Sequence, residues 1–295
     1  MPFRNYRFHG ETQNLDAARA NAPGQFVTLP DGVTHYELAG PPEGQPVVLV
    51  HGFSVPSFIW DPTFTGLAEK GFRVVRYDLF GRGYSDRPDV VYDQALFARQ
   101  LYALLDAVGF TAPINLAGLS MGGAIAVGFA AEHPERVRTL ALLSPAGFPV
   151  PATRVFGIMR LPWVGEWLLD RFAEKFIVAG LARDSFVQEH MTEFADRYRV
   201  QMQYPGFKRA LLSTLRHGPI STMAEAYQTV GKLACPVLLI WGRDDKTVPF
   251  AINEKVRAAI PRAEFHPIDN AGHIAHYEKP EVVNPLLASF FGQRI

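Results

Sequence analysis

One serine stands in a sequence context that would make its hydroxyl a nucleophile. The run Gly118–Gly122 has the form Gly-x-Ser-x-Gly with Ser120 at its centre. It follows an apolar stretch at Ile114–Leu116 and precedes a stretch rich in Ala and Gly. A strand-to-helix turn of this kind exposes the serine hydroxyl, and the helix N-terminus favours developing negative charge. We therefore predict that Ser120 attacks a carbonyl carbon.

A serine hydroxyl is a weak nucleophile near neutral pH, so it needs a base that takes its proton. A histidine held by a carboxylate can do this, and for a turn of this type the chain order is Ser, then Asp or Glu, then His. His273 follows the last predicted strand, Ala263–Ile268, on a loop that contains a glycine. His273 is therefore the predicted base, and His276 is the second candidate.

The carboxylate is expected after the preceding predicted strand, Pro236–Trp241. Two adjacent aspartates, Asp244 and Asp245, follow it, and because neighbouring side chains diverge only one of them can orient His273. The spacing from Gly242 favours Asp245, which leaves Asp244 as a turn or surface carboxylate. We expect Asp245 to accept the Nδ1 proton of His273 and to stabilise the imidazolium that forms.

An oxyanion hole needs two backbone N–H groups aimed at the tetrahedral oxygen. One donor is predicted at Met121, the residue after the nucleophile. The other is expected on the loop after the apolar run Pro46–Val50, where Phe53 is the preferred donor and Ser54 the second choice. His51 is expected to brace this loop through hydrogen bonds rather than to transfer protons.

An α/β architecture must position these groups. Short apolar runs alternate with amphipathic stretches, which is typical of a mostly parallel sheet covered on both faces. Strands are predicted at Gly24–Leu29, Val33–Leu38, Pro46–Val50, Phe72–Tyr77, Ile114–Leu116, Thr139–Leu143, Pro236–Trp241 and Ala263–Ile268. Helices are predicted at about 58–70, 92–108, 121–132, 250–259 and 281–291.

Residues 148–217 interrupt this alternation, because they contain no convincing strand. Two sets of apolar residues recur there at roughly helical spacing, so each set would form a stripe along one face of a helix. We expect most of these side chains to pack on the core. The first comprises Val187, Met191, Phe194, Tyr198 and Met202, and the second comprises Trp163, Trp167, Phe172 and Phe176. We predict a helical cap at 148–217, inserted into a catalytic core formed by 1–147 and 218–295.

Composition excludes several classes of protein. The 295 residues contain 29 Lys+Arg and 29 Asp+Glu, so the basic surface of a nucleic-acid-binding protein is not expected. A hydrophobic fraction of 48% excludes a disordered chain. Cys235 is the single cysteine, so there is no intramolecular disulfide and no multi-cysteine metal site. Without a visible signal peptide or an 18-residue apolar run, we expect a cytoplasmic protein with no membrane anchor.

Five motifs in order resemble the α/β-hydrolase superfamily and, within it, the capped bacterial serine esterases and meta-cleavage-product hydrolases. They are His51–Phe53, Asp78–Ser85, Gly118–Gly122, Gly242–Asp245 and Gly272–His273. The resemblance covers about 24–291 and implies an eight-stranded, mostly parallel sheet with an antiparallel second strand and a cap after the sixth. It also implies that Arg82 and Asp86 are salt-bridge partners of the scaffold rather than catalysts.

The resemblance narrows the reaction. Related haloalkane dehalogenases and epoxide hydrolases have Asp in place of Ser120, which argues against both. Meta-cleavage-product hydrolases usually carry Asn before the nucleophile and Trp after the histidine, where this chain has Leu119 and Ile274. Cofactor-free perhydrolases share the Ser-Met-Gly-Gly run at Ser120–Gly123 but usually have Trp in place of Phe53.

We therefore expect a serine carboxylesterase that cleaves small apolar esters of short-to-medium acyl chains through an acyl-enzyme. The alternatives are a carbon–carbon bond hydrolase of the meta-cleavage-product type, a cofactor-free perhydrolase and a ligand receptor with a hydrolase fold. The presence of Ser120, Asp245 and His273 together argues against the receptor. No Walker A, HExxH or GxGxxG sequence in the right context is present, so no metal or other cofactor is expected.

Overall fold

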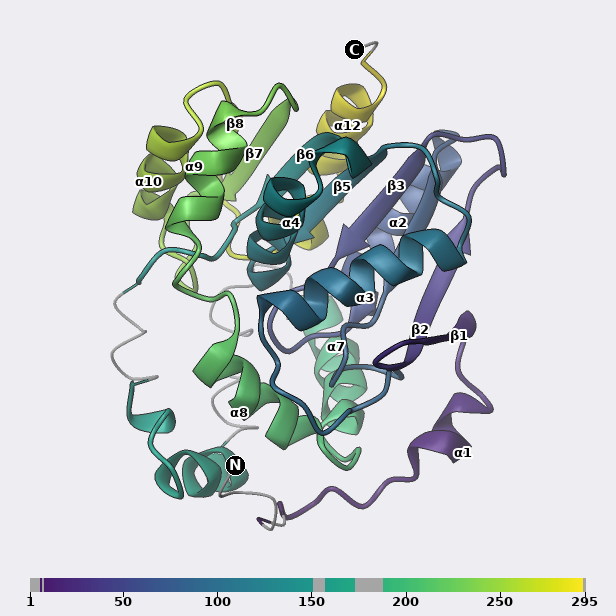
Figure 1. The fold of residues 1–295 in the computed structure, drawn as a ribbon, viewed down its shortest axis with the longest axis vertical. Coiled ribbons are helices and arrows are strands. Elements are labelled where there is room, and N and C mark those ends of the chain that lie inside the picture. The colour runs from purple at the N-terminus through teal and green to yellow at the C-terminus, as the bar shows by residue number, and fades with distance from the viewer. Residues whose placement is uncertain (1–5, 7, 151–156, 173–187, 294–295) are drawn as a thin grey trace.

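The computed structural model describes residues 6, 8–150, 157–172 and 188–293, and its centre is an eight-stranded sheet (Figure 1). The strands are β1 Gln25–Leu29, β2 Gly32–Ala39, β3 Pro46–Val50, β4 Arg73–Tyr77, β5 Ile114–Leu119, β6 Val137–Leu143, β7 Val237–Gly242 and β8 Glu264–Ile268. They lie in the order β1-β2-β4-β3-β5-β6-β7-β8. Strand β2 is antiparallel to β1 and β4, and the other neighbours are parallel. The predicted sheet is confirmed.

Helices cover both faces of this sheet (Figure 1). They are α1 Leu15–Arg19, α2 Asp61–Glu69, α3 Gln94–Ala107, α4 Met121–Glu132, α7 Gln188–Gln201, α8 Phe207–His217, α9 Ala224–Lys232, α10 Asn253–Ala259, α11 Ala275–Glu278 and α12 Pro280–Phe291. Helices α3, α4, α9 and α10 pack on one face, and α2 and α12 pack on the other. The residues of β5 and β7 are all buried, which explains why β7 is a continuous apolar run and why the one polar side chain of β5, Asn115, accepts from the Thr139 hydroxyl at 2.7 Å.

The element boundaries differ from the sequence predictions in two places that matter. Strand β5 continues to Leu119, so it ends directly at the predicted nucleophile. The helix predicted at 58–70 is divided into a 3₁₀ turn at Ser57–Trp60 and helix α2. A proline in the first turn of α2 explains the division, because proline is favoured at a helix start and not inside one.

Between β6 and β7 the described residues form helices and turns, among them α7, α8, α9 and the helical residues 164–172. In and just after α7, Phe194, Tyr198 and Met202 are buried as predicted. Val187, Phe176 and the side chain of Met191 lie outside the described part. The division of the chain into core and cap remains a prediction.

In the second aromatic stripe, Trp163 and Trp167 do not pack on the core, so the expectation was wrong for these two residues, while Phe176 lies outside the described part. Trp163 is 62% exposed and Trp167 is 51% exposed. The helical residues 164–172 turn Glu166 and Leu169 inward instead, because Glu166 pairs with Arg216 at 2.9 Å. Of the helices that the structure describes, none has the length and hydropathy needed to span a membrane.

Candidate active site

Ser120 occupies a strained turn between β5 and α4. Its φ of 54° and ψ of −120° are values that residues other than glycine rarely adopt. Its N–H donates to the carbonyl of Leu143 at 3.0 Å, and its carbonyl accepts from Gly123 at 3.0 Å and Ala146 at 2.9 Å. Strain of this kind persists only where the surrounding structure fixes the backbone, and it is concentrated at functional sites.

Two glycines permit the close contacts that this turn requires. A Cβ atom at Gly118 would lie 2.3 Å from the carbonyl oxygen of Gly122. A Cβ atom at Gly122 would lie 2.2 Å from the carbonyl oxygen of Val50. Any side chain at either position would therefore push the start of α4 away from β5 or β3. The glycines of the motif thus hold the N-terminus of α4 beside Ser120.

The structure brings His273 and Asp245 together. His273 Nδ1 lies 2.9 Å from Asp245 Oδ2, with the carboxylate wholly buried and the imidazole one-tenth exposed. The other carboxylate oxygen, Oδ1, accepts from the N–H groups of Thr247 at 2.9 Å and Val248 at 2.8 Å. These bonds fix the orientation of the carboxylate, which in turn fixes the orientation of the imidazole.

Asp244, the alternative acid, is exposed and its backbone N–H donates to the carbonyl of Ala271 at 3.0 Å. This bond joins the end of β7 to the loop after β8. Gly242 makes the approach possible, because a Cβ atom there would lie 2.1 Å from the carbonyl oxygen of Gly272. The contact of these two loops places the buried aspartate, rather than the exposed one, against the histidine.

His276, the alternative base, is a buried structural residue. Its Nε2 lies 3.0 Å from the carbonyl oxygen of Ile59, and its ring centroid lies 4.3 Å from that of Trp60. Burial lowers the pKa of His276 to about 3, so the ring is neutral near pH 7 and donates from Nε2 to that carbonyl. It therefore connects α11 to the 3₁₀ turn at Ser57–Trp60.

His51 holds the peptide group that carries the predicted Phe53 donor. His51 Nε2 accepts from the N–H of Leu79 at 2.9 Å, so the ring proton is on Nδ1, which lies 2.9 Å from the carbonyl oxygen of Gly52. In a trans peptide this bond directs the Phe53 N–H the opposite way. Burial lowers the pKa of His51 to about 4, which keeps the ring neutral and in this tautomer. His51 braces the loop as expected.

The loop that contains Phe53 lies directly against the nucleophile. A Cβ atom at Gly52 would lie 3.3 Å from Ser120 Cβ and 3.9 Å from Ser120 Oγ. Met121 is the first residue of α4, so its N–H has no partner within the helix. The loop after β3 and the start of α4 therefore both adjoin Ser120, and the roles of Phe53 and Met121 as oxyanion donors remain predictions.

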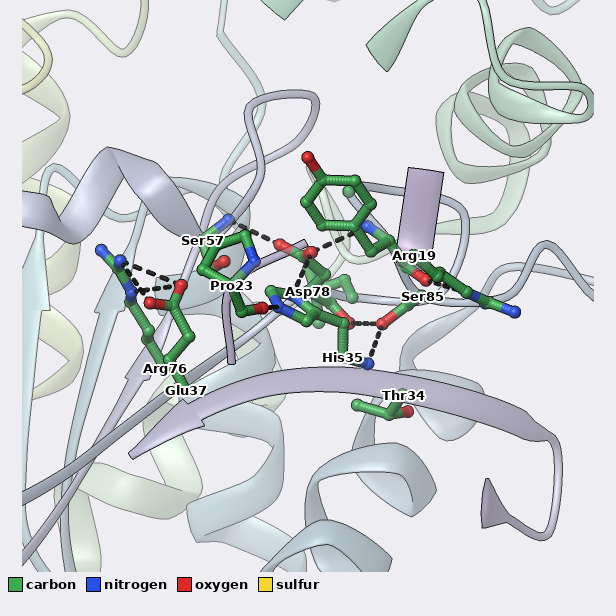
Figure 2. Close-up of polar contacts among 12 residues, drawn as sticks. Arg19, Pro23, Thr34, His35, Glu37, Ser57, Arg76, Asp78 and Ser85 are labelled. Carbon is green, nitrogen blue, oxygen red and sulfur yellow. Dashed lines mark hydrogen bonds and ion pairs between the residues drawn. The ribbon is translucent and has the colours of Figure 1, made fainter. Parts of the chain in front are cut away.

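Asp78, which belongs to one of the five motifs, forms a buried pair with His35 (Figure 2) that the sequence did not predict. Asp78 accepts from the N–H groups of Ser57 at 2.8 Å and Tyr84 at 2.9 Å, and it lies 2.8 Å from His35 Nδ1. His35 Nε2 lies 2.6 Å from the carbonyl oxygen of Pro23. Both ring nitrogens thus face acceptors, which favours the doubly protonated ring.

The pKa values of this pair follow from the same contacts. Burial by itself would raise the pKa of Asp78, but His35 and the backbone donors hold it well below its usual range. Burial opposes the charge on His35 as well, yet Asp78 raises the pKa of His35 overall. The pair joins β2 to the loop after β4 and stabilises the part of the scaffold next to the 3₁₀ turn.

Of the two residues expected to form salt bridges of the scaffold, Asp86 does so, whereas Arg82 is held by other contacts. Asp86 is a scaffold partner, because it pairs with Arg19 at 2.6 Å and accepts from the N–H of Val33 at 2.7 Å. Within the described ranges no carboxylate pairs with Arg82, so the salt bridge expected for it was wrong. Its side chain is directed into the protein, where its hydrogen bonds go to two backbone carbonyls and the hydroxyl of Thr214.

Among the described residues, no three His, Cys, Asp or Glu side chains converge closely enough to hold a metal ion. Cys235 packs beside β6, with its Sγ 3.7 Å from the carbonyl oxygen of Arg138. Burial raises the pKa of this thiol to about 11, so it is a neutral packing residue near pH 7. The expectation of a cofactor-free reaction remains a prediction.

Comparison with known proteins gives matches over most of the chain. Residues 45–280 match the profile of a family described as alpha/beta hydrolase fold. A 2-hydroxy-6-oxo-6-phenylhexa-2,4-dienoate hydrolase from Comamonas testosteroni is 29% identical over 90% of this chain and 93% of its own length. A 2-hydroxymuconate semialdehyde hydrolase from Pseudomonas putida is 30% identical over 85% and 88%, respectively. A thermophilic esterase from Thermogutta terrifontis, solved with malate bound, has a TM-score of 0.76 at 25% identity, over 90% of this chain and 98% of the esterase chain.

Proposed function

Because the chain belongs to the α/β-hydrolase family, we propose that it is a serine carboxylesterase in which Ser120, His273 and Asp245 form the catalytic triad. The observation that carries the proposal is the 2.9 Å contact between His273 Nδ1 and Asp245 Oδ2. Strands β5, β6, β7 and β8 are parallel neighbours, so their carboxyl ends share one edge of the sheet. Ser120 follows the end of β5, Asp245 the end of β7 and His273 the end of β8.

Acylation proceeds by attack of Ser120 Oγ on the ester carbonyl carbon while His273 Nε2 takes the hydroxyl proton. The carbonyl π electrons move to the oxygen, which accepts hydrogen bonds from the N–H groups of Phe53 and Met121. Asp245 stabilises the imidazolium. The tetrahedral intermediate then collapses, the bond to the alcohol oxygen breaks, and His273 protonates the departing alcohol.

Deacylation repeats these steps with water as the nucleophile. His273 takes a proton from water, and the resulting hydroxide oxygen bonds to the acyl carbon. When this second intermediate collapses, the bond to Ser120 Oγ breaks and His273 returns the proton to that oxygen. The products are a carboxylic acid and the free enzyme, and no cofactor enters the balance.

The residues beside the catalytic groups favour an apolar acyl chain. Leu119 and Met121 flank the nucleophile, Ile274 follows the base, and all three are buried. An apolar surface next to the reacting carbon binds hydrocarbon better than charge, because burying an unpaired charge is unfavourable. A small ester with a short-to-medium acyl chain is the substrate class that fits these neighbours.

Hydrolysis of a carbon–carbon bond is the second candidate function. The relatives from Comamonas testosteroni and Pseudomonas putida are named as hydrolases of a dienoate and of a muconate semialdehyde, and they align over most of this chain. The same three catalytic residues could begin that reaction by attacking a ketone. The buried apolar side chains of Leu119 and Ile274, where such enzymes usually carry Asn and Trp, favour the ester over the dienoate.

A direct comparison of substrates decides between the two candidates. The purified protein is assayed with p-nitrophenyl esters of increasing acyl length and with a 2-hydroxy-6-oxohexa-2,4-dienoate. We expect kcat/KM for the best ester to exceed that for the dienoate by at least about 100-fold, which corresponds to about 2.7 kcal/mol of transition-state stabilisation. The reverse order would replace esterase activity by carbon–carbon bond hydrolysis.

A further inference from the structure

Arg82 is a buried guanidinium whose hydrogen bonds all go to uncharged oxygens. Its Nε donates to the carbonyl of Phe53 at 2.9 Å, Nη1 to the carbonyl of Phe80 at 3.0 Å and Nη2 to the hydroxyl of Thr214 at 2.9 Å. No carboxylate in the described part of the chain forms an ion pair with it. Arg76, by contrast, is mostly buried and pairs with two carboxylates. A buried charge without a counter-ion is costly, so its retention indicates a use for the charge.

Aromatic rings supply the rest of the surroundings of Arg82. The ring centroids of Phe53, Tyr92 and Phe97 lie 5.7, 5.9 and 5.7 Å from its Cζ atom. Rings at this distance stabilise a cation without neutralising it. Burial lowers the pKa of Arg82 to about 10, which still leaves the guanidinium charged near neutral pH.

Arg82 and His51 together hold both peptide groups that flank Phe53. His51 binds the carbonyl of Gly52, which belongs to the peptide before Phe53, and Arg82 binds the carbonyl of Phe53, which belongs to the peptide after it. With both planes held, the direction of the Phe53 N–H is fixed. Since a residue's own N and O atoms lie within about 3.6 Å of each other, Arg82 Nε lies within about 6.5 Å of the predicted oxyanion donor.

The same guanidinium contacts α8, which lies in the predicted cap. The Thr214 hydroxyl donates to the carbonyl of Ala210 at 2.8 Å, so its lone pair is free to accept from Arg82. The loop that carries Arg82 approaches α8 closely, because a Cβ atom at Gly81 would lie 2.4 Å from Ala210 Cβ. The Arg82 side chain therefore binds both the loop that carries Phe53 and the predicted cap.

We propose that Arg82 is the positioning residue of the oxyanion hole, acting through the Phe53 peptide and contributing its uncompensated positive charge to the tetrahedral oxyanion. The proposal rests on the serine-hydrolase function given above. The negative charge forms only in the transition state and the intermediate, so the interaction raises kcat and leaves substrate binding almost unchanged. The contact with Thr214 makes this positioning dependent on α8.

Two substitutions at Arg82 separate charge from geometry. Arg82→Met removes the charge and all three donors but retains a long side chain. Arg82→Lys retains the charge but loses the planar guanidinium that donates to all three acceptors at once. We expect kcat for a p-nitrophenyl ester to fall about 50-fold in Arg82→Met and about 10-fold in Arg82→Lys, with KM within about threefold of wild type. Affinity for a trifluoromethyl ketone, which forms a charged tetrahedral adduct with Ser120, should fall by the same factors.

Two further variants serve as the comparison. Thr214→Val removes the contact of Arg82 with α8, together with the local bond from this hydroxyl to the Ala210 carbonyl, and we expect kcat to fall about fivefold with KM unchanged. Arg76→Met removes another mostly buried arginine, one that contacts none of the proposed catalytic groups. It should lower the melting temperature while kcat stays within about twofold.

The proposal is overturned if folded Arg82→Met keeps the wild-type kcat and trifluoromethyl ketone affinity, or if the loss in kcat/KM comes from KM. If Arg82→Met fails to fold, Arg82→Lys and Thr214→Val decide, and unchanged ketone affinity in both overturns it. Failure of the proposed function gives a different result whatever the Arg82 variants do: either the wild type prefers the dienoate to every ester, or Ser120→Ala retains ester hydrolysis.

Discussion

Asp245→Asn offers the sharpest test of how the triad is built, because the structure fixes what the new amide would do. In the wild type, Oδ1 accepts two backbone N–H groups and Oδ2 faces His273 Nδ1. An amide has one oxygen and one NH₂, so it cannot serve both sides as an acceptor. If the NH₂ faced the backbone donors of Thr247 and Val248, two hydrogen bonds would be lost and donors would face donors.

The amide is therefore expected to place its oxygen toward the backbone and its NH₂ toward His273. This orientation preserves two hydrogen bonds and replaces a charged acceptor by a neutral one, so we expect unfolding free energy to fall by only about 1–2 kcal/mol. The imidazole must then accept at Nδ1 and carry its proton on Nε2. A ring in that tautomer cannot take the serine proton, and kcat should fall by about 10⁴, or about 5.5 kcal/mol in barrier.

The assay is ester hydrolysis under saturating substrate, with thermal unfolding measured on the same samples. Asp244→Asn is the matched control, because this neighbouring aspartate is exposed, whereas Asp245 is buried against the histidine. Its kcat should stay within about twofold of wild type. The role given to Asp245 is wrong if Asp245→Asn keeps more than a tenth of wild-type kcat, or if Asp244→Asn loses more activity than Asp245→Asn.

Two further predictions concern the scaffold. Gly122→Ala places a Cβ atom 2.2 Å from the carbonyl oxygen of Val50. We therefore expect the free energy of unfolding, measured in urea, to fall by about 2–4 kcal/mol. An unchanged urea midpoint would contradict the close packing of α4 on β3. His35→Gln removes an imidazole whose pKa is raised in the folded protein. Such a group stabilises the folded state at pH values below its unfolded pKa of about 6.5, and this stabilisation is lost as the pH rises through the folded pKa. The difference in unfolding free energy between wild type and His35→Gln should therefore be larger at pH 6 than at pH 9; a pH-independent difference would argue against the charged pair with Asp78.

Much of the sheet and the placement of the candidate catalytic residues could be predicted because their signals are local. A strand buried on both faces is expected to be almost entirely apolar, as β3 and β7 are. The choice between Asp244 and Asp245 also depended on a short spacing from Gly242, which the turn after β7 preserves. In each case the constraint acts over a few residues of chain.

The features that the sequence did not reveal depend on partners far apart in the chain. Arg82 contacts Thr214, 132 residues away, and His35 contacts Asp78, 43 residues away. No spacing rule connects such positions, because tertiary packing alone brings them together. The outward orientation of Trp163 and Trp167 has the same origin, since the buried partners available to Glu166 and Leu169 decide which face of the helix turns inward.

Trapping the acyl-enzyme and locating the acyl group tests directly whether Ser120 is the nucleophile. Wild-type protein is quenched with acid during turnover of a p-nitrophenyl ester, digested and examined by mass spectrometry. Ser144→Ala is the matched control, because Ser144 is a buried serine with a φ of 42° directly after β6, the neighbour of β5. We expect one acyl group on Ser120 in wild type and in Ser144→Ala, and none in Ser120→Ala, which should not turn over the ester. An acyl group on any other residue, or continued turnover by folded Ser120→Ala, would contradict the role of Ser120 as the nucleophile.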